Sequence, residues 1–277
     1  MRTLKGSSLL IERGGDLELK KVSLSTFSYL PNLTLVDQLR PLIRQLFSAG
    51  EQGAFYIPRP IVNGAQALFQ DAAGTVAVTA GGDPVGKMMD QSPNSNNASQ
   101  SVSADRPVYE LGSVRESLAF NGNNSGLDAG VPKSIFEESF SASFWLYFND
   151  DSRGTILSNL DDSRGYGLEK HTSGRFRIWY NGSPDVNTSS GVVPINEWVH
   201  CVFIRDVASN NFRIYVNKAL IRTYTGVGTY TGAGSDTPLL GRDIRTGATV
   251  LDGNIGNTVI VNKVLSQSEI DNLYDYG

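Results

Sequence analysis

Residues 198–221 read WVHCVFIRDVASNNFRIYVNKALI, which are two apolar runs separated by a polar turn. The first run, residues 198–204, is apolar at nearly every position, which is typical of a strand buried on both faces. The second run, residues 212–216, alternates between apolar side chains on one face and more polar ones on the other. Residues 206–211 between them tolerate tight-turn dihedrals. The stretch predicts a β-hairpin, which other strands must cover because an isolated hairpin is barely stable in water.

The composition of the chain indicates many strands joined by many turns. The 277 residues include 29 glycines, and charged residues make up 19%, below the usual share of about 25%. The length suits one large β domain with an extension, or two small domains. The net charge of −4 argues against a nucleic-acid partner, although it leaves room for a local basic patch.

Cysteine usage and hydropathy narrow the class of protein further. Cys201 is the only cysteine, so an intramolecular disulfide is excluded, and its place in an apolar run predicts a buried small hydrophobe. No stretch approaches the roughly 20 apolar residues that cross a bilayer. No secretory signal is visible, because the apolar run at residues 9–11 is short and Glu12 interrupts it. We therefore expect no membrane insertion.

Metal-binding residues are few in this sequence. Two histidines and one cysteine do not favour a zinc site. Calcium at the rim of the domain is an alternative, with oxygen ligands from acidic loop residues, here Asp150, Asp151, Asp161 and Asp162. Simple solvation of these loops is the favoured interpretation, and we expect no cofactor.

Residues 1–50 differ from the rest of the chain in their pattern of apolar residues. Residues 9–19 suggest a pair of short strands, and the apolar residues within 35–47 recur at helical spacing. Pro41 is expected to kink this helix or to split it at Arg40. The apolar stripe must be buried, either on the chain's own β domain or on another protein.

Residues 51–277 repeat a rhythm of short strands and turns. The polar run 94–103 is interpreted as an ordered loop with a short edge strand. Ser266 and Glu269 form a capping box that starts a C-terminal helix. With so little helix, the strands predict an antiparallel two-sheet sandwich. Besides the hairpin, the predicted strands lie at 117–120, 142–148, 153–157, 175–180, 239–240 and 258–261.

Ordered motifs between residues 117 and 277 carry a family resemblance. They are LAFNG at 118–122, SFWL at 143–146, WVH at 198–200, IYVN at 214–217, GNI at 253–255 and LSQSEI at 265–270. This segment resembles a laminin-G-like, concanavalin A-like jelly-roll domain, except that Lys218 replaces the glycine usual after IYVN. The resemblance implies an all-β, antiparallel two-sheet jelly roll. We therefore expect this domain over residues 51–277 with a short C-terminal helix, and we interpret residues 1–50 as an N-terminal anchoring extension.

A second resemblance covers the segment before the jelly roll. GEQGA at 50–54, LFQD at 68–71, GDPVG at 82–86, DQS at 90–92 and NASQ at 97–100 resemble the lead-in of tailed-bacteriophage virion proteins that carry this fold. The resemblance implies a virion protein of a tail, fibre or capsid surface, assembled in the host cytoplasm. Other virion proteins would dock on residues 1–50, and a symmetric homo-oligomer is expected.

Catalytic residues are not evident in the sequence. Glycoside hydrolysis usually needs two carboxylates about 5 to 9 Å apart, and hydrolases of this fold carry a Glu-x-Asp-x-Glu run that is missing here. The acidic i, i+2 pairs are Asp16/Glu18 in the extension and Glu269/Asp271 in the terminal helix. We expect His200 to be buried and His171 to be solvated. We therefore predict that the protein is not an enzyme.

The outward faces of the strands supply the candidate binding residues. Aromatic and arginine side chains on one open sheet suit stacking on sugar rings or a protein hot spot, and the alternative is that loops or the extension cover them. The leading hypothesis is a lectin-like module that contacts host-surface glycan or another virion protein. A purely structural decoration or connector subunit is the alternative, and a glycan hydrolase is less favoured. The candidates are Trp145, Tyr147, Arg177, Trp179, Arg213 and Tyr215.

Overall fold

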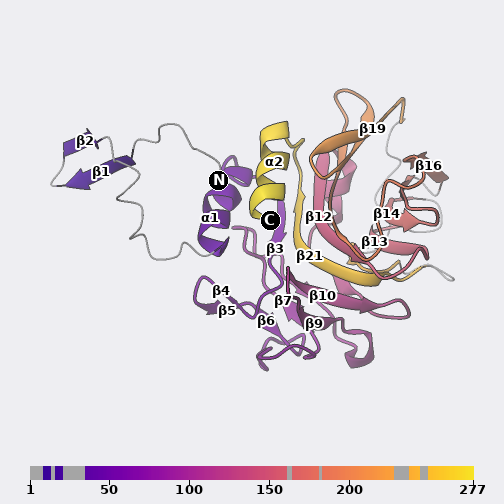
Figure 1. The fold of residues 1–277 in the computed structure, drawn as a ribbon, viewed down its shortest axis with the longest axis horizontal. Helices are drawn as coiled ribbons and strands as arrows, with labels where there is room; N and C mark the ends of the chain where they lie inside the picture. The colour runs from indigo at the N-terminus through magenta and orange to yellow at the C-terminus, as the bar shows by residue number, and fades with distance from the viewer. Residues whose placement is uncertain are drawn as a thin grey trace.

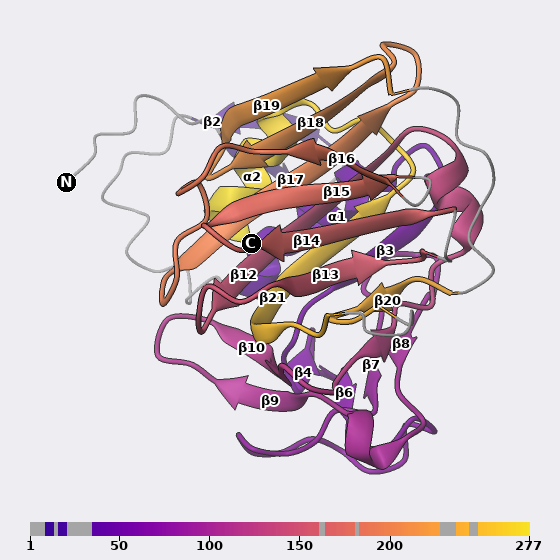
Figure 2. The ribbon, with the colours of Figure 1, turned by 90° about the vertical axis from the view of Figure 1, so that its right-hand side faces the viewer.

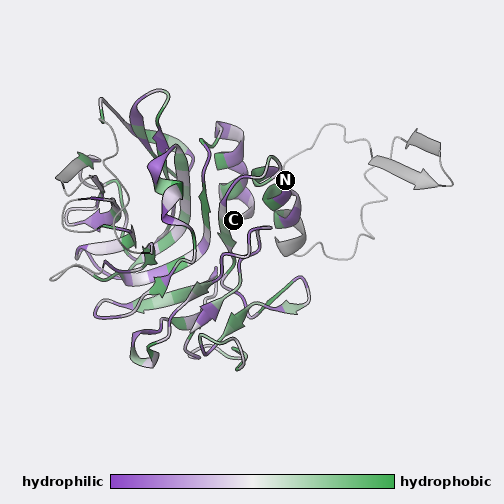
Figure 3. Ribbon diagram, turned by 180° about the vertical axis from the view of Figure 1, so that it is seen from behind, coloured by the Kyte–Doolittle hydropathy of each residue, from purple (hydrophilic) through white to green (hydrophobic). Residues whose placement is uncertain are grey.

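Two antiparallel sheets face each other across one hydrophobic core (Figure 1). The computed structural model describes residues 9–13, 16–20, 35–160, 164–180, 183–227, 237–243 and 249–277. The sandwich confirms the predicted all-β fold class, and apolar and polar residues alternate along its long strands (Figure 3). Among the residues so described, no helix is both long and apolar enough to cross a membrane.

Sheet 1 contains the hairpin on which the prediction was built. In spatial order its strands are β19 (Ala219–Thr225), β18 (Asn211–Val216), β17 (Trp198–Asp206), β12 (Phe140–Phe148), β21 (Asp252–Val261), β10 (Glu116–Asn121) and β9 (Val108–Leu111), and β3 (Gly53–Tyr56) also pairs with β21.

Sheet 2 packs against it and includes the polar run that was predicted to be ordered. Its strands are β16 (Ser183–Asn187), β15 (Arg175–Tyr180), β14 (Tyr166–His171), β13 (Gly154–Ser158), β20 (Leu239–Leu240), β11 (Leu127–Asp128), β8 (Ala98–Ser99), β7 (Lys87–Met88) and β6 (Leu68–Phe69). Outside the sheets lie the strand pairs β1 (Leu9–Arg13)–β2 (Asp16–Lys20) and β4 (Ile61–Val62)–β5 (Ala65–Gln66), and the 3-10 turns η2 (Ser103–Asp105) and η3 (Lys133–Glu137).

Strand β17 is buried on both faces, as its uninterrupted apolar run predicted. Cys201 and Phe203 point into the core between the sheets, where Phe203 meets Phe176 of sheet 2 with ring centroids 5.3 Å apart. Val202 and Ile204 point the other way, into a second apolar cluster. Two hydrophobic layers therefore meet on this one strand.

The two helices supply the second cluster by covering the outer face of sheet 1 (Figure 1). They are α1 (Leu35–Leu46) and α2 (Gln267–Tyr276). Leu42 and Leu46 of α1 are buried against side chains such as Val202 and Val259 of the sheet. Of the two alternatives for the apolar stripe, the structure shows packing on the chain's own β domain. The same apolar cluster includes side chains from both sides of residue 50.

Of the two expected effects of Pro41, the split at Arg40 is wrong, because α1 extends from Leu35 to Leu46 with Pro41 inside it. Pro41 lies on the exposed side of the helix. A proline inside a helix costs about 3 kcal/mol, whereas burying a single leucine or isoleucine side chain contributes about 1.5 to 3 kcal/mol. Leu39, Leu42, Ile43 and Leu46 are all buried, so the burial outweighs the missing hydrogen bond.

Helix α2 begins with the capping box that the sequence predicted. Ser266 Oγ accepts a hydrogen bond from the Glu269 N–H at 3.3 Å, and the Glu269 carboxylate accepts one from the Ser266 N–H at 2.8 Å. Lys263 lies 2.8 Å from Glu269 and 3.5 Å from Glu51. These charges join the start of α2 to the segment that follows α1.

Candidate functional site

The six candidate residues do not form one surface, contrary to the expectation of a single open sheet. Two outer faces of a sandwich point in opposite directions, so residues on different sheets cannot share a flat binding face. The sequence pattern indicated which side of each strand faces outward but not to which sheet the strand belongs. Trp145 and Tyr147 (β12) and Arg213 and Tyr215 (β18) lie on sheet 1, whereas Arg177 and Trp179 (β15) lie on sheet 2.

Three of the six already have structural partners within the chain. Trp145 is only 7% exposed and its ring lies 5.2 Å from that of Tyr274 in α2. Tyr215 is 6% exposed and belongs to the cluster between sheet 1 and the helices. Arg213 pairs with Asp206 at 3.3 Å. The alternative of coverage therefore applies to Trp145 and Tyr215, whereas Arg213 is held by an ion pair.

Tyr147 instead lines a pocket of about 710 Å³ on the outer face of sheet 1, which we call the aromatic pocket. Strands β9, β10, β12 and β21 form its floor, and the segments 112–115 and 196–198 form its walls. The residues that matter for its chemistry are Glu110, Arg115, Tyr147, Asn149, Glu197, Trp198 and Asn254.

Two aromatic rings lie next to each other in this pocket. Tyr147 and Trp198 are directly opposite on β12 and β17, and their ring centroids are 5.6 Å apart at an interplanar angle of 55°. Both side chains are half-buried, so part of each ring faces the pocket. The Arg115 guanidinium lies 5.8 Å from the Trp198 ring and stacks on Trp145 at 3.7 Å.

Hydrogen-bonding groups surround the rings. Asn254 donates to the Glu110 carboxylate and, at 3.0 Å, to Ser117 Oγ. Asn149 donates to Asp252 at 2.6 Å, and Glu197 is exposed at the wall. Aromatic faces beside a few placed amide and carboxylate groups can hold a polyhydroxylated ring through both its apolar and its polar sides.

Sequence reasoning identified Tyr147 but missed its partners in the pocket. Trp198 was assigned to an apolar run with both faces buried, and no local signal marks it as half-exposed. Its position opposite Tyr147 depends on the β12–β17 register. Glu110 on β9 and Asn254 on β21 are 144 residues apart in sequence. They meet because β9 and β21 both pair with β10.

The buried histidine resembles part of a catalytic dyad but lacks access to solvent. His200 Nε2 lies 2.8 Å from Ser143 Oγ, and the two residues are 1% and 3% exposed. Burial, with a smaller contribution from Arg115, lowers the pKa of His200 to about 3. Its Nδ1 finds no hydrogen-bond partner in the described residues. An imidazole that is enclosed and this weakly basic, with no orienting carboxylate among the described residues, is not placed to act as a general base for a bound substrate.

The acidic residues proposed for a rim calcium site are only partly described. Asp161 and Asp162 lie outside the described residues. The Asp151 carboxylate accepts hydrogen bonds from the Ser173 and Gly174 N–H groups and from Lys170, which lower its pKa. Within the described ranges no three His, Cys, Asp or Glu residues form a metal-binding group.

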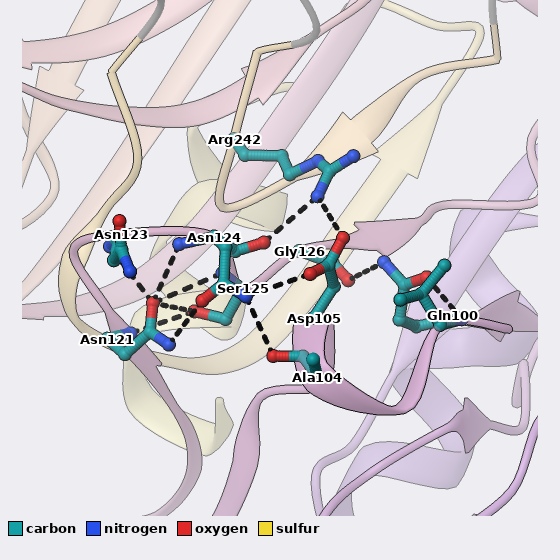
Figure 4. Close-up of polar contacts among 10 residues, drawn as sticks. Gln100, Ala104, Asp105, Asn121, Asn123, Asn124, Ser125, Gly126 and Arg242 are labelled. Atoms are coloured by element: carbon teal, nitrogen blue, oxygen red, sulfur yellow. Dashed lines mark hydrogen bonds and ion pairs between the residues drawn. The ribbon is translucent and has the colours of Figure 1, made fainter.

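A second rim loop is stabilised by an arginine. Figure 4 shows Arg242 donating to the Asp105 carboxylate and to the Asn124 carbonyl, both at 2.9 Å. Asn121 Oδ1 accepts from the Asn123 and Asn124 N–H groups at 3.0 Å. The oxygens that line this loop are therefore already engaged by N–H donors.

Comparisons with known proteins agree with the fold. A laminin-G family model, described as the concanavalin A-like lectin/glucanases superfamily, matches residues 121–271, more than half of the chain. No curated protein sequence gives a significant match.

Solved structures with this fold are similar in shape and distant in sequence. Domain 4 of AbnA, a GH43 extracellular arabinanase from Geobacillus stearothermophilus in complex with arabinotriose, is 20% identical with a TM-score of 0.50, covering 61% of this chain and 81% of that one. Trypanosoma rangeli sialidase in complex with 2,3-difluorosialic acid is 15% identical with a TM-score of 0.52, covering 87% and 37%. Ruminococcus gnavus IT-sialidase CBM40 bound to α2,3-sialyllactose is 15% identical with a TM-score of 0.49, covering 58% and 96%.

Proposed function

The chain belongs to the concanavalin A-like lectin/glucanases superfamily, and from this premise we propose that it is a lectin-like protein whose aromatic pocket binds glycan. The observation that carries the proposal is the opposition of Tyr147 and Trp198 in a pocket of about 710 Å³. Ligand pockets are mostly apolar and aromatic with a few placed polar groups. Tyr147 and Trp198 supply the aromatic faces of this pocket, and most of its other lining residues are polar or charged.

The polar groups of the pocket suit sugar hydroxyls. The carboxylates of Glu110 and Glu197 can accept from hydroxyl groups, and the Asn149 and Asn254 amides border the same space. Hydrogen bonds to charged groups are about twice as strong as those between neutral groups. The AbnA domain and the Trypanosoma rangeli sialidase were solved with arabinotriose and 2,3-difluorosialic acid, which supports saccharides as the first ligands to test.

The proposal includes a virion setting, which rests on the resemblance of residues 50–100 to the lead-in of tailed-bacteriophage virion proteins. In that setting the pocket contacts host-surface glycan or another virion protein, and the chain forms a symmetric homo-oligomer in the particle. The apolar stripe of α1 is buried on sheet 1. Docking on other virion proteins therefore falls to the residues before Leu35 and to the exposed side of α1, which carries Arg40 and Arg44.

The pocket is tested by screening the full chain on a glycan array and then measuring affinity by calorimetry. We expect Trp198→Ala and Tyr147→Ala to abolish binding to the best glycan, while Tyr276→Ala, which removes another partly exposed aromatic ring, leaves it unchanged. Unchanged binding in folded pocket variants would disprove this site. An array without any bound glycan would favour the alternative of a purely structural decoration or connector subunit.

Glycoside hydrolysis is a second candidate function, because the pocket contains the two carboxylates of Glu110 and Glu197. Two carboxylates near one saccharide are the minimum that such enzymes use. We expect binding without cleavage, so incubation with the bound glycan should release no reducing ends. Release that disappears in both Glu110→Gln and Glu197→Gln would instead identify a hydrolase.

A further inference from the structure

The outer face of sheet 2 differs from that of sheet 1, because α1 and α2 lie behind the sandwich when sheet 2 faces the viewer (Figure 2). On β15, Phe176 and Ile178 point into the core. Arg175, Arg177 and Trp179 alternate with them and therefore share the outer face. We call this surface the arginine platform, and it also includes Arg153, Glu169 and Asn187.

A buried carboxylate organises the platform. Glu169 is 2% exposed and lies directly opposite Arg177 in the β14–β15 pairing. Its Oε2 accepts from Arg153 Nε at 2.9 Å and Nη2 at 2.7 Å, and its Oε1 lies 3.3 Å from Arg177 Nη1. Arg177 Nε donates to Asn187 at 3.1 Å. Two guanidinium groups are thus oriented before any ligand arrives, which lowers the entropy cost of binding.

An aromatic ring lies close to both of these arginines. The guanidinium carbons of Arg153 and Arg177 are 5.3 and 5.6 Å from the centroid of the Trp179 ring. Both distances fall within the range of about 6 Å for a cation–π interaction. Trp179 is half-buried. The platform therefore presents part of an aromatic face flanked by positive charge.

Positive charge on the platform exceeds what its carboxylate neutralises. Among the side chains that the structure describes, Glu169 is the only carboxylate within ion-pairing distance of Arg153, Arg175 or Arg177. Burial lowers the pKa of Arg177, the Glu169 carboxylate opposes this shift, and repulsion from Arg153 and Arg175 adds to it. Within the described residues, Arg153 Nη1, Arg175 Nη1 and Arg177 Nη2 donate to no acceptor. Each guanidinium therefore keeps an N–H₂ group for an anion.

We propose that the arginine platform is a second binding surface, selective for saccharides that carry carboxylate or sulfate groups. The anionic groups pair with the free N–H₂ groups, and the sugar ring lies against Trp179. The chain as a whole carries −4, so a long polyanion such as a nucleic acid is repelled outside this patch. The platform and the aromatic pocket lie on opposite sheets, so one chain can hold two separate saccharides.

The test is calorimetry on the full chain with three oligosaccharides of equal length: a chondroitin sulfate tetrasaccharide, a galacturonate tetramer and neutral cellotetraose. We expect one or both charged probes to bind at 50 mM NaCl, to weaken strongly at 500 mM, and to bind more tightly than cellotetraose. Arg175→Gln should weaken binding about tenfold, the loss expected for one charge-assisted hydrogen bond. Arg175 makes no ion pair in the described residues, so this variant keeps the Glu169 network.

Two controls separate binding at the platform from binding elsewhere on the chain. Arg222→Gln removes an exposed arginine on β19 of sheet 1 and should change nothing. Trp198→Ala should leave binding of the charged probes intact even if it abolishes binding at the aromatic pocket. The proposal is overturned if Arg175→Gln binds normally, if Trp198→Ala abolishes binding of the charged probes, if cellotetraose binds equally well, or if single-stranded DNA binds more tightly than every saccharide.

Discussion

The ammonium group of Lys218 lies 2.6 Å from the Asp275 carboxylate and joins the β18–β19 turn to the last turn of α2. The same nitrogen lies 4.8 Å from the Tyr274 ring centroid. Lys218 also has a φ of +73°, a left-handed conformation that costs a residue other than glycine about 1 to 2 kcal/mol. An exposed ion pair contributes about 0 to 1 kcal/mol. The turn therefore combines a strained backbone with a contact to the helix that offsets only part of the strain.

This balance can be measured with two substitutions at one position. Both Lys218→Gly and Lys218→Ala remove the ion pair, but only glycine relieves the left-handed strain. We expect Lys218→Gly to be more stable than Lys218→Ala by about 1 kcal/mol in urea unfolding. Equal stability of the two variants would show that the backbone at this turn is not strained.

Helix α1 is expected to contribute to the stability of the β domain. Leu46 is 0% exposed between α1 and sheet 1, so Leu46→Ala should lower the free energy of unfolding by about 2 to 5 kcal/mol. The control Leu220→Ala, at a leucine 50% exposed on β19, should change it by less than about 0.5 kcal/mol. A negligible effect of Leu46→Ala would contradict the packing of α1 on the sheet.

Acid is expected to destabilise the fold through His200. Its pKa is about 3 in the folded chain and about 6.5 when unfolded, so the unfolded state binds the proton first. The contribution of neutral His200 to the free energy of unfolding is fully present above pH 6.5. It is lost between pH 6.5 and 3, by about 1.4 kcal/mol per pH unit. Urea unfolding at pH 7 and pH 5 should show a smaller pH-dependent loss in His200→Gln than in the parent. The same loss in both would remove His200 as the cause.

Cys201 should be inert toward thiol reagents in the folded chain. It is 0% exposed, and burial raises the pKa of its thiol well above the usual value. Because the thiolate is the reactive form, labelling should be negligible in buffer and rapid in denaturant. Fast labelling under native conditions would mean that sheet 1 opens around β17.

The fold could be predicted because its signal is local. Alternation in residues 142–148 and 175–180 identified strands, and Ser266 with Glu269 identified the start of α2. The effect of Pro41 was misjudged because the free-energy cost of a proline in a helix can be read from the local sequence. The burial of α1 that offsets this cost depends on packing against sheet 1 and cannot be read there.

The proposed binding surfaces could be predicted only in part because they depend on register and coverage. Alternation indicated that Trp145 and Tyr147 point outward, but α2 covers the first and leaves the second in the pocket. The pairing of Tyr147 with Trp198 follows from the β12–β17 register. Likewise, Arg177 and Trp179 were assigned to the outer face, while their partner Glu169 was found only through the β14–β15 register.

The most direct test of glycan binding at the aromatic pocket is the fluorescence of Trp198 during titration with the best array glycan. The chain has three tryptophans, so Trp145→Phe with Trp179→Phe leaves Trp198 as the only indole reporter. We predict a saturable change in its emission, with a midpoint that matches the calorimetric affinity. Emission from Trp198 that stays constant while calorimetry records glycan binding would contradict the account.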